Sequence, residues 1–222
     1  MTDRQRAQLS SRKKPQQARS NDLVAAILEA ALQVLAKEGA QRFTTTRVAE
    51  KAGVSVGSIY QYFPNKASIL FRLQSDEWRQ TTAMLHETLQ DASRPPLERL
   101  RRLVHQFVQS ECDEAGMRVA LNDAAPLYRD APEAREVRAA SAGVLKGFMR
   151  EVLPDATAAR RTLAGELIKT TLSAVGKEFS ETPRTAREIA RYSDAMADMF
   201  CAYLTNLGQS ERTTSLPHAK PR

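Results

Sequence analysis

The chain has 222 residues, about one and a half average domains, and 42% of them are hydrophobic. This composition supports a folded core and excludes a disordered, collagen-like or low-complexity chain. Cys112 and Cys201 have no partner at metal-ligand spacing, so we expect two buried small side chains and neither a metal site nor a disulfide. No apolar run approaches the roughly 20 residues of a membrane span, and no secretory signal is present, so we expect a cytoplasmic protein without membrane contact.

The positive charge is concentrated in the first third of the chain. Residues 1–75 carry 12 basic and 5 acidic side chains, whereas residues 76–222 carry 21 of each. A basic segment attached to a neutral body favours a polyanionic partner. Nucleic acid is favoured over a membrane surface because no amphipathic helix in this part has a continuous basic face. The alternative is an unpaired, solubilising segment.

Helical periodicity dominates the sequence, and strand alternation is nearly absent, which predicts an all-α fold. Residues 1–20 are basic and lack apolar periodicity, so we expect a flexible arm there. Apolar residues then recur every three and four positions as far as Gly39, which predicts a helix over 21–38.

Two short helices are predicted next. Thr44 can cap a helix that ends near Gly53, and Ser55 can cap a second one that stops at Pro64. Two short helices joined by a turn with glycine, packed on a longer helix, are typical of a helix-turn-helix. The sequence therefore predicts a three-helix head over 21–66.

A longer segment without Pro or Gly follows and predicts a helix over 66–92. Further helices are predicted over 97–112, 117–128, 133–152, 156–179 and 185–207, which gives about nine in all. The larger helical domain is expected over 67–207. A flexible tail is expected over 208–222, because that stretch is polar and contains two prolines.

Residues 39–66, GAQRFTTTRVAEKAGVSVGSIYQYFPNK, resemble the TetR/AcrR-type transcriptional regulators. The positions shared at the family's spacing are Gly39, the Thr run 44–46, Val48, Ala49, Ala52, Gly53, Val54, Ser55, Gly57, Tyr60, Phe63 and Lys66. Beyond Leu73 the resemblance is limited to length and helical layout. It implies a homodimeric regulator, by family habit a repressor, that binds a palindromic double-stranded DNA operator and is released by a small-molecule effector.

The second short helix carries the residues expected to approach base edges. Small side chains in its first turn let the backbone enter the major groove. These residues are Ser55, Val56, Gly57 and Ser58. Gly57 costs a helix about 1 kcal/mol relative to Ala, and close approach to DNA explains why it is there. Gln61 has the paired donor and acceptor that suit adenine.

The resemblance also implies contacts to the DNA backbone. The residues expected to hold phosphates are Thr44, Tyr60, Tyr62 and Lys66. Those expected to add a base or phosphate contact are Thr45, Thr46 and Arg47. The family commonly has an acidic residue where this chain has Arg47, whose charge favours DNA. The apolar residues of the head, Val48, Ala49, Val54, Ile59 and Phe63, are predicted to be core.

A catalytic motif appears in the same stretch but lacks its context. Residues 53–57 spell G-x-S-x-G, which in a hydrolase presents the serine as a nucleophile after a strand. No strand is predicted before Gly53, and the three histidines occupy two helices and the tail, which leaves Ser55 without a base. No nucleotide-binding or metal motif is present, so we expect neither an enzyme nor a cofactor.

The resemblance implies an effector site in the larger domain. The candidate residues are Trp78, His105, Phe107, Cys112, Met117, Tyr128, Phe148 and Met149. The alternative for each is ordinary core packing, because helical spacing alone produces such stripes.

The last two predicted helices carry more apolar surface than one neighbouring helix covers. Two such helices from each of two chains would close a four-helix bundle about a two-fold axis, as in the regulators that this chain resembles. The alternative is that these stripes face helices of their own domain. The expected interface residues are Leu163, Leu167, Leu172, Ile189, Tyr192, Met196, Met199 and Tyr203.

Two other functions stay open at this stage. One is a helix-turn-helix protein that binds DNA constitutively or architecturally, with a solid body and no effector. The other is an enzyme on an all-α scaffold. A partly apolar cavity in the body would favour an effector, and a perturbed acid-base pair inside it would favour catalysis.

Overall fold

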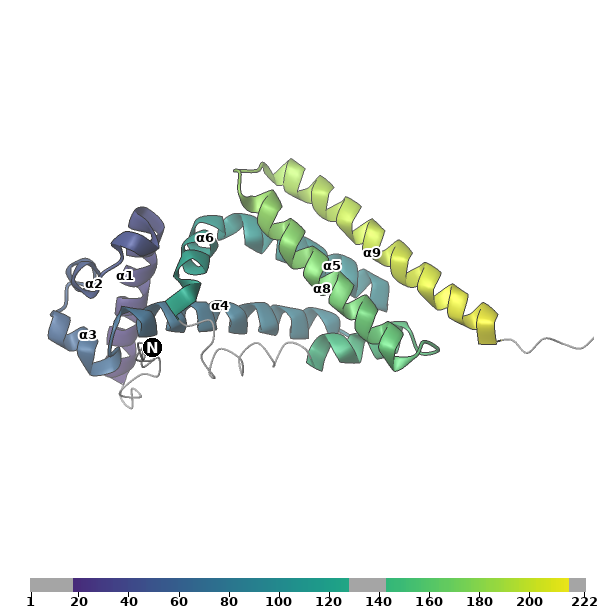
Figure 1. Cartoon of the computed structure of the whole chain (residues 1–222), viewed down its shortest axis with the longest axis horizontal. Coiled ribbons are helices and arrows are strands. Elements are labelled where there is room, and N and C mark those ends of the chain that lie inside the picture. The colour runs from purple at the N-terminus through teal and green to yellow at the C-terminus, as the bar shows by residue number, and fades with distance from the viewer. Residues whose placement is uncertain (1–17, 128–142, 216–222) are drawn as a thin grey trace, which may run out of the picture. The chain divides into compact units, whose positions relative to one another are not determined.

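A computed structural model of the chain describes residues 18–127 and 143–215, and every regular element in these ranges is a helix (Figure 1). The predicted all-α fold is thus confirmed. The elements are α1 (Ala18–Arg42), α2 (Thr45–Ala52), α3 (Val56–Tyr62), α4 (Lys66–Leu89), α5 (Pro96–Asp113), α6 (Ala115–Ala124), the 3₁₀ helix η1 (Ala125–Leu127), a helix over 143–152, α8 (Ala158–Ser180) and α9 (Ala186–Ser215).

The chain divides into two compact units. The head unit contains the described residues up to Arg79 together with 116–127, and the body unit contains 80–115 and 143–215. The head unit is larger than the predicted 21–66, because it includes the first part of α4 and most of α6. Periodicity could delimit each helix but could not show which helices share a core.

Local signals in the sequence set the helix ends of the head unit. Gly39 interrupts α1 with φ 74° and ψ 172°, close to the predicted end of this helix. Thr44 caps α2, because its hydroxyl accepts a hydrogen bond from the Arg47 N–H. Gly53 ends α2 in the left-handed conformation, with φ 67°, and its N–H donates to the carbonyls of Ala49 and Glu50.

One apolar core and one shielded ion pair hold the head unit together. Apolar residues of α1, α2 and α3 gather around Phe43, which is fully buried, and so do the first turns of α4. Farther along α4, Glu77 forms an ion pair with Arg118 of α6 at 3.1 Å and accepts a hydrogen bond from Gln74. Glu77 and Arg118 are largely shielded from water, so the α4 to α6 contact requires both charges.

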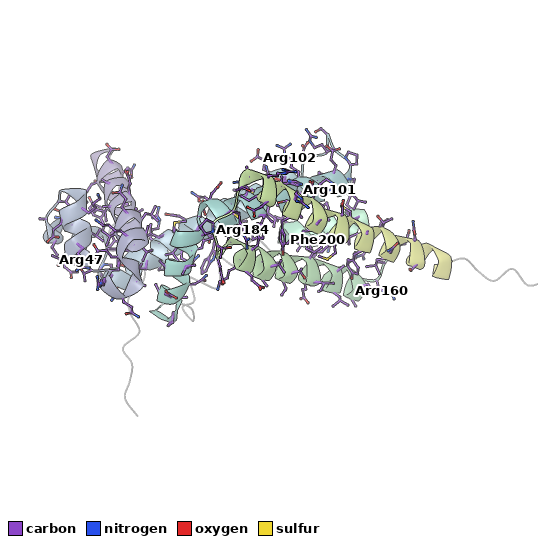
Figure 2. All side chains as sticks on the ribbon, turned by 90° about the horizontal axis from the view of Figure 1, so that it is seen from above. Arg47, Arg101, Arg102, Arg160, Arg184 and Phe200 are labelled. Carbon is purple, nitrogen blue, oxygen red and sulfur yellow. The ribbon has the colours of Figure 1, made fainter. Side chains whose placement is uncertain are left out.

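The body unit is built on α5, which packs against both α8 and α9. Figure 1 shows the three helices, and Figure 2 labels Phe200, one of the buried residues that α9 contributes to this core. Gly176 lets α8 approach α5 closely: a Cβ at this position would lie 3.1 Å from Cε1 of Phe107 and 3.3 Å from Cγ of Glu111. An ion pair of Arg101 with Asp198 and a hydrogen bond between His105 and Asp194 join α5 to α9.

Arg99 is the buried cation of the body unit, with 3% of its surface exposed. Its guanidinium donates to the carbonyl of Leu89 at the end of α4 and forms an ion pair with Glu151. It also lies 5.7 Å from the ring centroid of Phe148. Arg99 therefore joins α5 to the end of α4 and to the helix over 143–152.

The end of the chain differs from the predicted flexible tail. α9 continues through Gly208 to Ser215 instead of ending near residue 207. No proline lies between the start of α9 and Pro217, and the helix packs near Leu153 at Gly208, where a Cβ would lie 3.7 Å from the Leu153 side chain.

The close approach of α8 to α5 predicts the effect of a larger side chain at Gly176. We expect Gly176→Val to reduce the free energy of unfolding by about 1–3 kcal/mol, because its methyl groups would overlap Phe107. Chemical denaturation followed by circular dichroism measures this loss. Gly147→Ala is the control, since a Cβ there meets nothing within 4 Å. Equal stability of the two variants would show that α8 can move away from α5 at no cost.

Candidate nucleic-acid interface

α3 is a seven-residue helix whose ends and inner face are fixed by its own sequence. The Ser55 hydroxyl caps it by accepting a hydrogen bond from the Ser58 N–H at 3.0 Å. Ile59, Tyr62 and Phe63 are buried in the core of the head unit. Because such a short helix is unstable alone, this burial holds the opposite face in place.

The opposite face of α3 presents small and polar groups. Ser55, Gly57 and Gln61 are exposed, and Ser58 is half-buried with its hydroxyl 2.8 Å from that of Ser55. A Cβ at Gly57 would meet only the Ser55 hydroxyl, at 3.6 Å, so nothing within the head unit requires glycine here. The absence of a side chain leaves the backbone of α3 open to close approach at this position. Val56 differs from its neighbours, because it is half-buried against the head core.

Hydroxyl groups from α2 and α3 meet beside this face. The Thr45 hydroxyl lies 3.4 Å from the hydroxyl of Tyr60, whose side chain is 41% exposed. Thr44 and Thr46 are also exposed. These groups can donate hydrogen bonds to phosphate oxygens on one side of the exposed face of α3.

Lys66 lies exposed in the first turn of α4, next to a reciprocal cap. The Asn65 side chain accepts from the Ser68 N–H at 2.9 Å, and the Ser68 hydroxyl donates to the Asn65 carbonyl at 2.6 Å. The cap fixes the helix start. It thereby combines a lysine with the positive end of a long helix, an arrangement that suits a phosphate.

Tyr62 and Arg47, both predicted to contact DNA, have structural roles within the head unit. Tyr62 is only 6% exposed and belongs to the head core, because the helical repeat turns it to the side of Ile59. Arg47 forms an ion pair with Glu38 and donates to the Arg42 carbonyl at 3.1 Å. Figure 2 labels Arg47 in the head unit. The Glu38 carboxylate of α1 compensates the charge of Arg47. This ion pair accounts for an arginine at a position where the family commonly has an acidic residue.

The residues predicted to surround an effector are divided between the two units. Trp78 and Met117 pack against the core of the head unit, whereas Phe107, Phe148 and Met149 belong to the core of the body unit. Tyr128 lies outside the described residues. The apolar stripes used in the prediction belong to two separate cores, which periodicity alone cannot distinguish.

The polar members of that set also have structural roles. His105 lies 3.0 Å from Asp194, so its ring joins α5 to α9. Burial raises the pKa of the Cys112 thiol, and the carboxylate of Asp113 adds to this effect. The thiol therefore keeps its proton at neutral pH and is not activated as a nucleophile. Within the described parts of the chain, no group of three or more His, Cys, Asp or Glu side chains is placed to hold a metal ion.

The body unit contains an open groove of about 820 Å³ between the helix over 143–152 and α8. Only Met149 of the predicted effector residues lines it. The sequence signal for this groove is a pair of rows at i and i+4: Leu145 and Met149 beside Lys146 and Arg150. These rows predict a groove only when the helix that faces them is known.

The predicted interface residues divide into two groups. Leu172, Ile189 and Met196 are buried within their own protomer, and Tyr192 and Tyr203 are half-buried there. Exposed large apolar side chains remain, namely Leu163 at 62%, Leu167 at 48% and Met199 at 51%. Leu172 lies one helical turn before Gly176, on the side of α8 that meets α5.

The two short helices, the turn at Gly53 and the exposed face of α3 define a helix-turn-helix. The sequence comparisons agree. The family "Bacterial regulatory proteins, tetR family" matches residues 27–73, and "Tetracyclin repressor-like, C-terminal domain" matches residues 95–207. The chain belongs to the TetR family of transcriptional regulators. No helix in the described parts of the chain is long and apolar enough to cross a membrane.

The sequence similarity to individual relatives covers only part of this chain, whereas the structural similarity covers most of it. The repressor KstR of Rhodococcus jostii is 30% identical over 111 residues, which is half of each chain. The chain spans between about a third and a half of the length of the curated relatives it matches. A TetR-family regulator from Mesorhizobium loti has a TM-score of 0.66 at 18% identity, covering 84% of this chain and 98% of its own. FadR of Bacillus subtilis, solved with stearoyl-CoA, has 0.61 at 17% identity, covering 80% and 97%.

The open space above Gly57 predicts opposite effects on stability and on DNA binding. We expect Gly57→Ala to stabilise the head by up to about 1 kcal/mol, because alanine favours the helix and its Cβ fits. The same methyl group should weaken binding to operator DNA selected from a random pool. Thermal unfolding and fluorescence anisotropy measure the two effects. Unchanged or tighter DNA binding would place the closest DNA contact elsewhere.

Proposed function

We propose that this protein is a homodimeric transcriptional repressor that binds a palindromic operator and is released from it by a small-molecule effector. The observation that carries the proposal is the exposed face of α3, where Gly57 is unexplained by internal packing and Gln61 points away from the core. Its proposed target, DNA, agrees with the predicted cytoplasmic location. The sequence relative KstR is a transcriptional repressor, which supports repression over activation.

We assign the DNA contacts by position on the head unit. Ser55, Gly57, Ser58 and Gln61 lie where base edges would meet α3. The residues proposed to hold phosphates are Thr44, Thr45, Thr46, Tyr60 and Lys66. Tyr62 and Arg47 are left out because their side chains serve the head itself.

Exposed apolar stripes on α8 and α9 support the homodimer. On α8, Leu163, Leu167 and Ala174 lie on one exposed side, and on α9 Ala195 and Met199 do the same. An isologous contact between two copies would cover these stripes and form a four-helix bundle. The two-fold axis of such a dimer suits a palindromic operator.

The groove in the body unit favours an effector-responsive regulator over a constitutive DNA-binding protein. A constitutive or architectural protein needs no hollow in its body, whereas about 820 Å³ is within the range of small-molecule sites. A protein that binds DNA constitutively is the second candidate. Operator binding that no small molecule alters would favour it.

A first test concerns Lys66. We expect Lys66→Ala to weaken binding to all DNA sequences similarly and to reduce the slope of log affinity against log salt by about one per protomer, because one phosphate contact is lost. Gln61→Ala should instead change the preference at one or two base pairs and leave the slope unchanged. Both follow from anisotropy titrations at several salt concentrations. An unchanged slope for Lys66→Ala would remove Lys66 from the contacts.

A second test concerns the dimer. We expect the double variant Leu167→Glu with Met199→Glu to be monomeric and to lose operator binding, because like charges would face each other across the interface. Sedimentation velocity and anisotropy measure the two properties. The control is Ser173→Glu with Thr205→Glu, which adds equal charge at exposed positions outside the stripes. An intact dimer in the first variant would move the interface to another surface.

A further inference from the structure

The groove between the helix over 143–152 and α8 has an apolar floor. Leu145 and Met149 come from one wall, and Gly165 of α8 faces them. A Cβ at Gly165 would lie 3.3 Å from Cγ of Met149 and 3.6 Å from Leu145, so these side chains reach the α8 backbone. Met149 and Gly165 are buried, so the apolar surface open to a hydrocarbon group comes from Leu145 and from Leu163, which also lines the groove.

Cations surround this floor. Lys146 and Arg150 follow Leu145 and Met149 by one residue on the first wall, and all four lie on the groove. On α8, Arg161 and Lys169 lie one helical turn before and after Gly165, on the same side of the helix. Glu166 is the carboxylate among the lining residues.

The positive charge of this groove is not compensated by neighbouring acids. Among the residues that the structure describes, no carboxylate forms an ion pair with Lys146, Arg150, Arg161 or Lys169. Arg161 donates to the carbonyls of Leu153 and Pro154, both at 3.2 Å, which anchors it at the groove without neutralising it. The groove is therefore locally basic, although residues 76–222 as a whole are neutral.

We propose that this groove binds an amphipathic anion, a molecule with a hydrocarbon chain and a phosphate or carboxylate head. The chain would lie along Leu145 and Leu163, and the head would meet Lys146 and Lys169. Leu163 also belongs to the stripe assigned to the dimer, so the two surfaces share this residue. Leu167 follows Gly165 by two residues, about 200° around α8, so this part of the stripe faces away from the floor.

The inference deepens the proposed function by naming the chemistry of the effector, and only its regulatory step rests on that function. Binding and operator release are therefore measured separately. The probe is monododecyl phosphate below its micelle concentration, titrated into the full-length protein by calorimetry. Inorganic phosphate, dodecanol and dodecyltrimethylammonium test the head alone, the chain alone and the opposite charge.

We expect monododecyl phosphate to bind and the three comparison compounds to bind at least about tenfold more weakly, because charge-assisted contacts and apolar burial are both needed. Dodecanoate separates a general anion site from a phosphate-selective one. Lys146→Ala with Lys169→Ala should weaken the probe about tenfold or more. The control, Lys177→Ala with Arg187→Ala, removes two exposed cations outside the groove and should leave binding unchanged.

Three results would overturn the site. They are no binding of the monomeric probe to the native protein, binding only to anionic vesicles, and equal loss in both double variants. A groove covered by a second copy of the chain would give the first of these. If the probe binds as expected but does not release operator DNA, the site is confirmed and its role as the effector site is rejected.

Discussion

The burial of α5 against two other helices is the interaction on which the body unit depends. α8 and α9 both contact α5, so the same helix supplies the inner surface for each. Phe107 meets the backbone of α8 at Gly176, while Arg101 and His105 pair with acids of α9. Once α5 has fixed the orientation of α8 and α9, the outward sides of these two helices are determined. The exposed apolar stripes and the basic groove are both consequences of that orientation.

In the head unit, α3 has to be held firmly while most of one of its sides stays exposed. Ile59, Tyr62 and Phe63 supply the burial, and Ser55 supplies the cap. A seven-residue helix has only two turns, so each of its residues serves either the core or the exposed face. This explains why Tyr60 and Tyr62, two residues apart, have opposite environments.

Signals within a few residues made the fold predictable. Gly39, Gly53 and Pro64 mark chain reversals whose geometry is local, and the helix-turn-helix followed from their spacing. Partners distant in the sequence were not predictable in the same way. The pairing of Arg47 with Glu38 depends on how α2 packs against α1, and the exposure of Leu163 but not Leu172 depends on which side of α8 meets α5. Periodicity shows that a helix has an apolar side, but not which neighbour covers it.

Arg99 has a consequence for the order in which the body unit assembles. A buried guanidinium without partners costs several kcal/mol, so its burial is favourable only after both partners are in place. Those partners, the carbonyl of Leu89 and the carboxylate of Glu151, are 10 and 52 residues away along the chain. Partly assembled states that contain one partner but not the other are therefore unstable. The start of α5 is expected to close late, in one cooperative step with the end of α4 and the helix over 143–152.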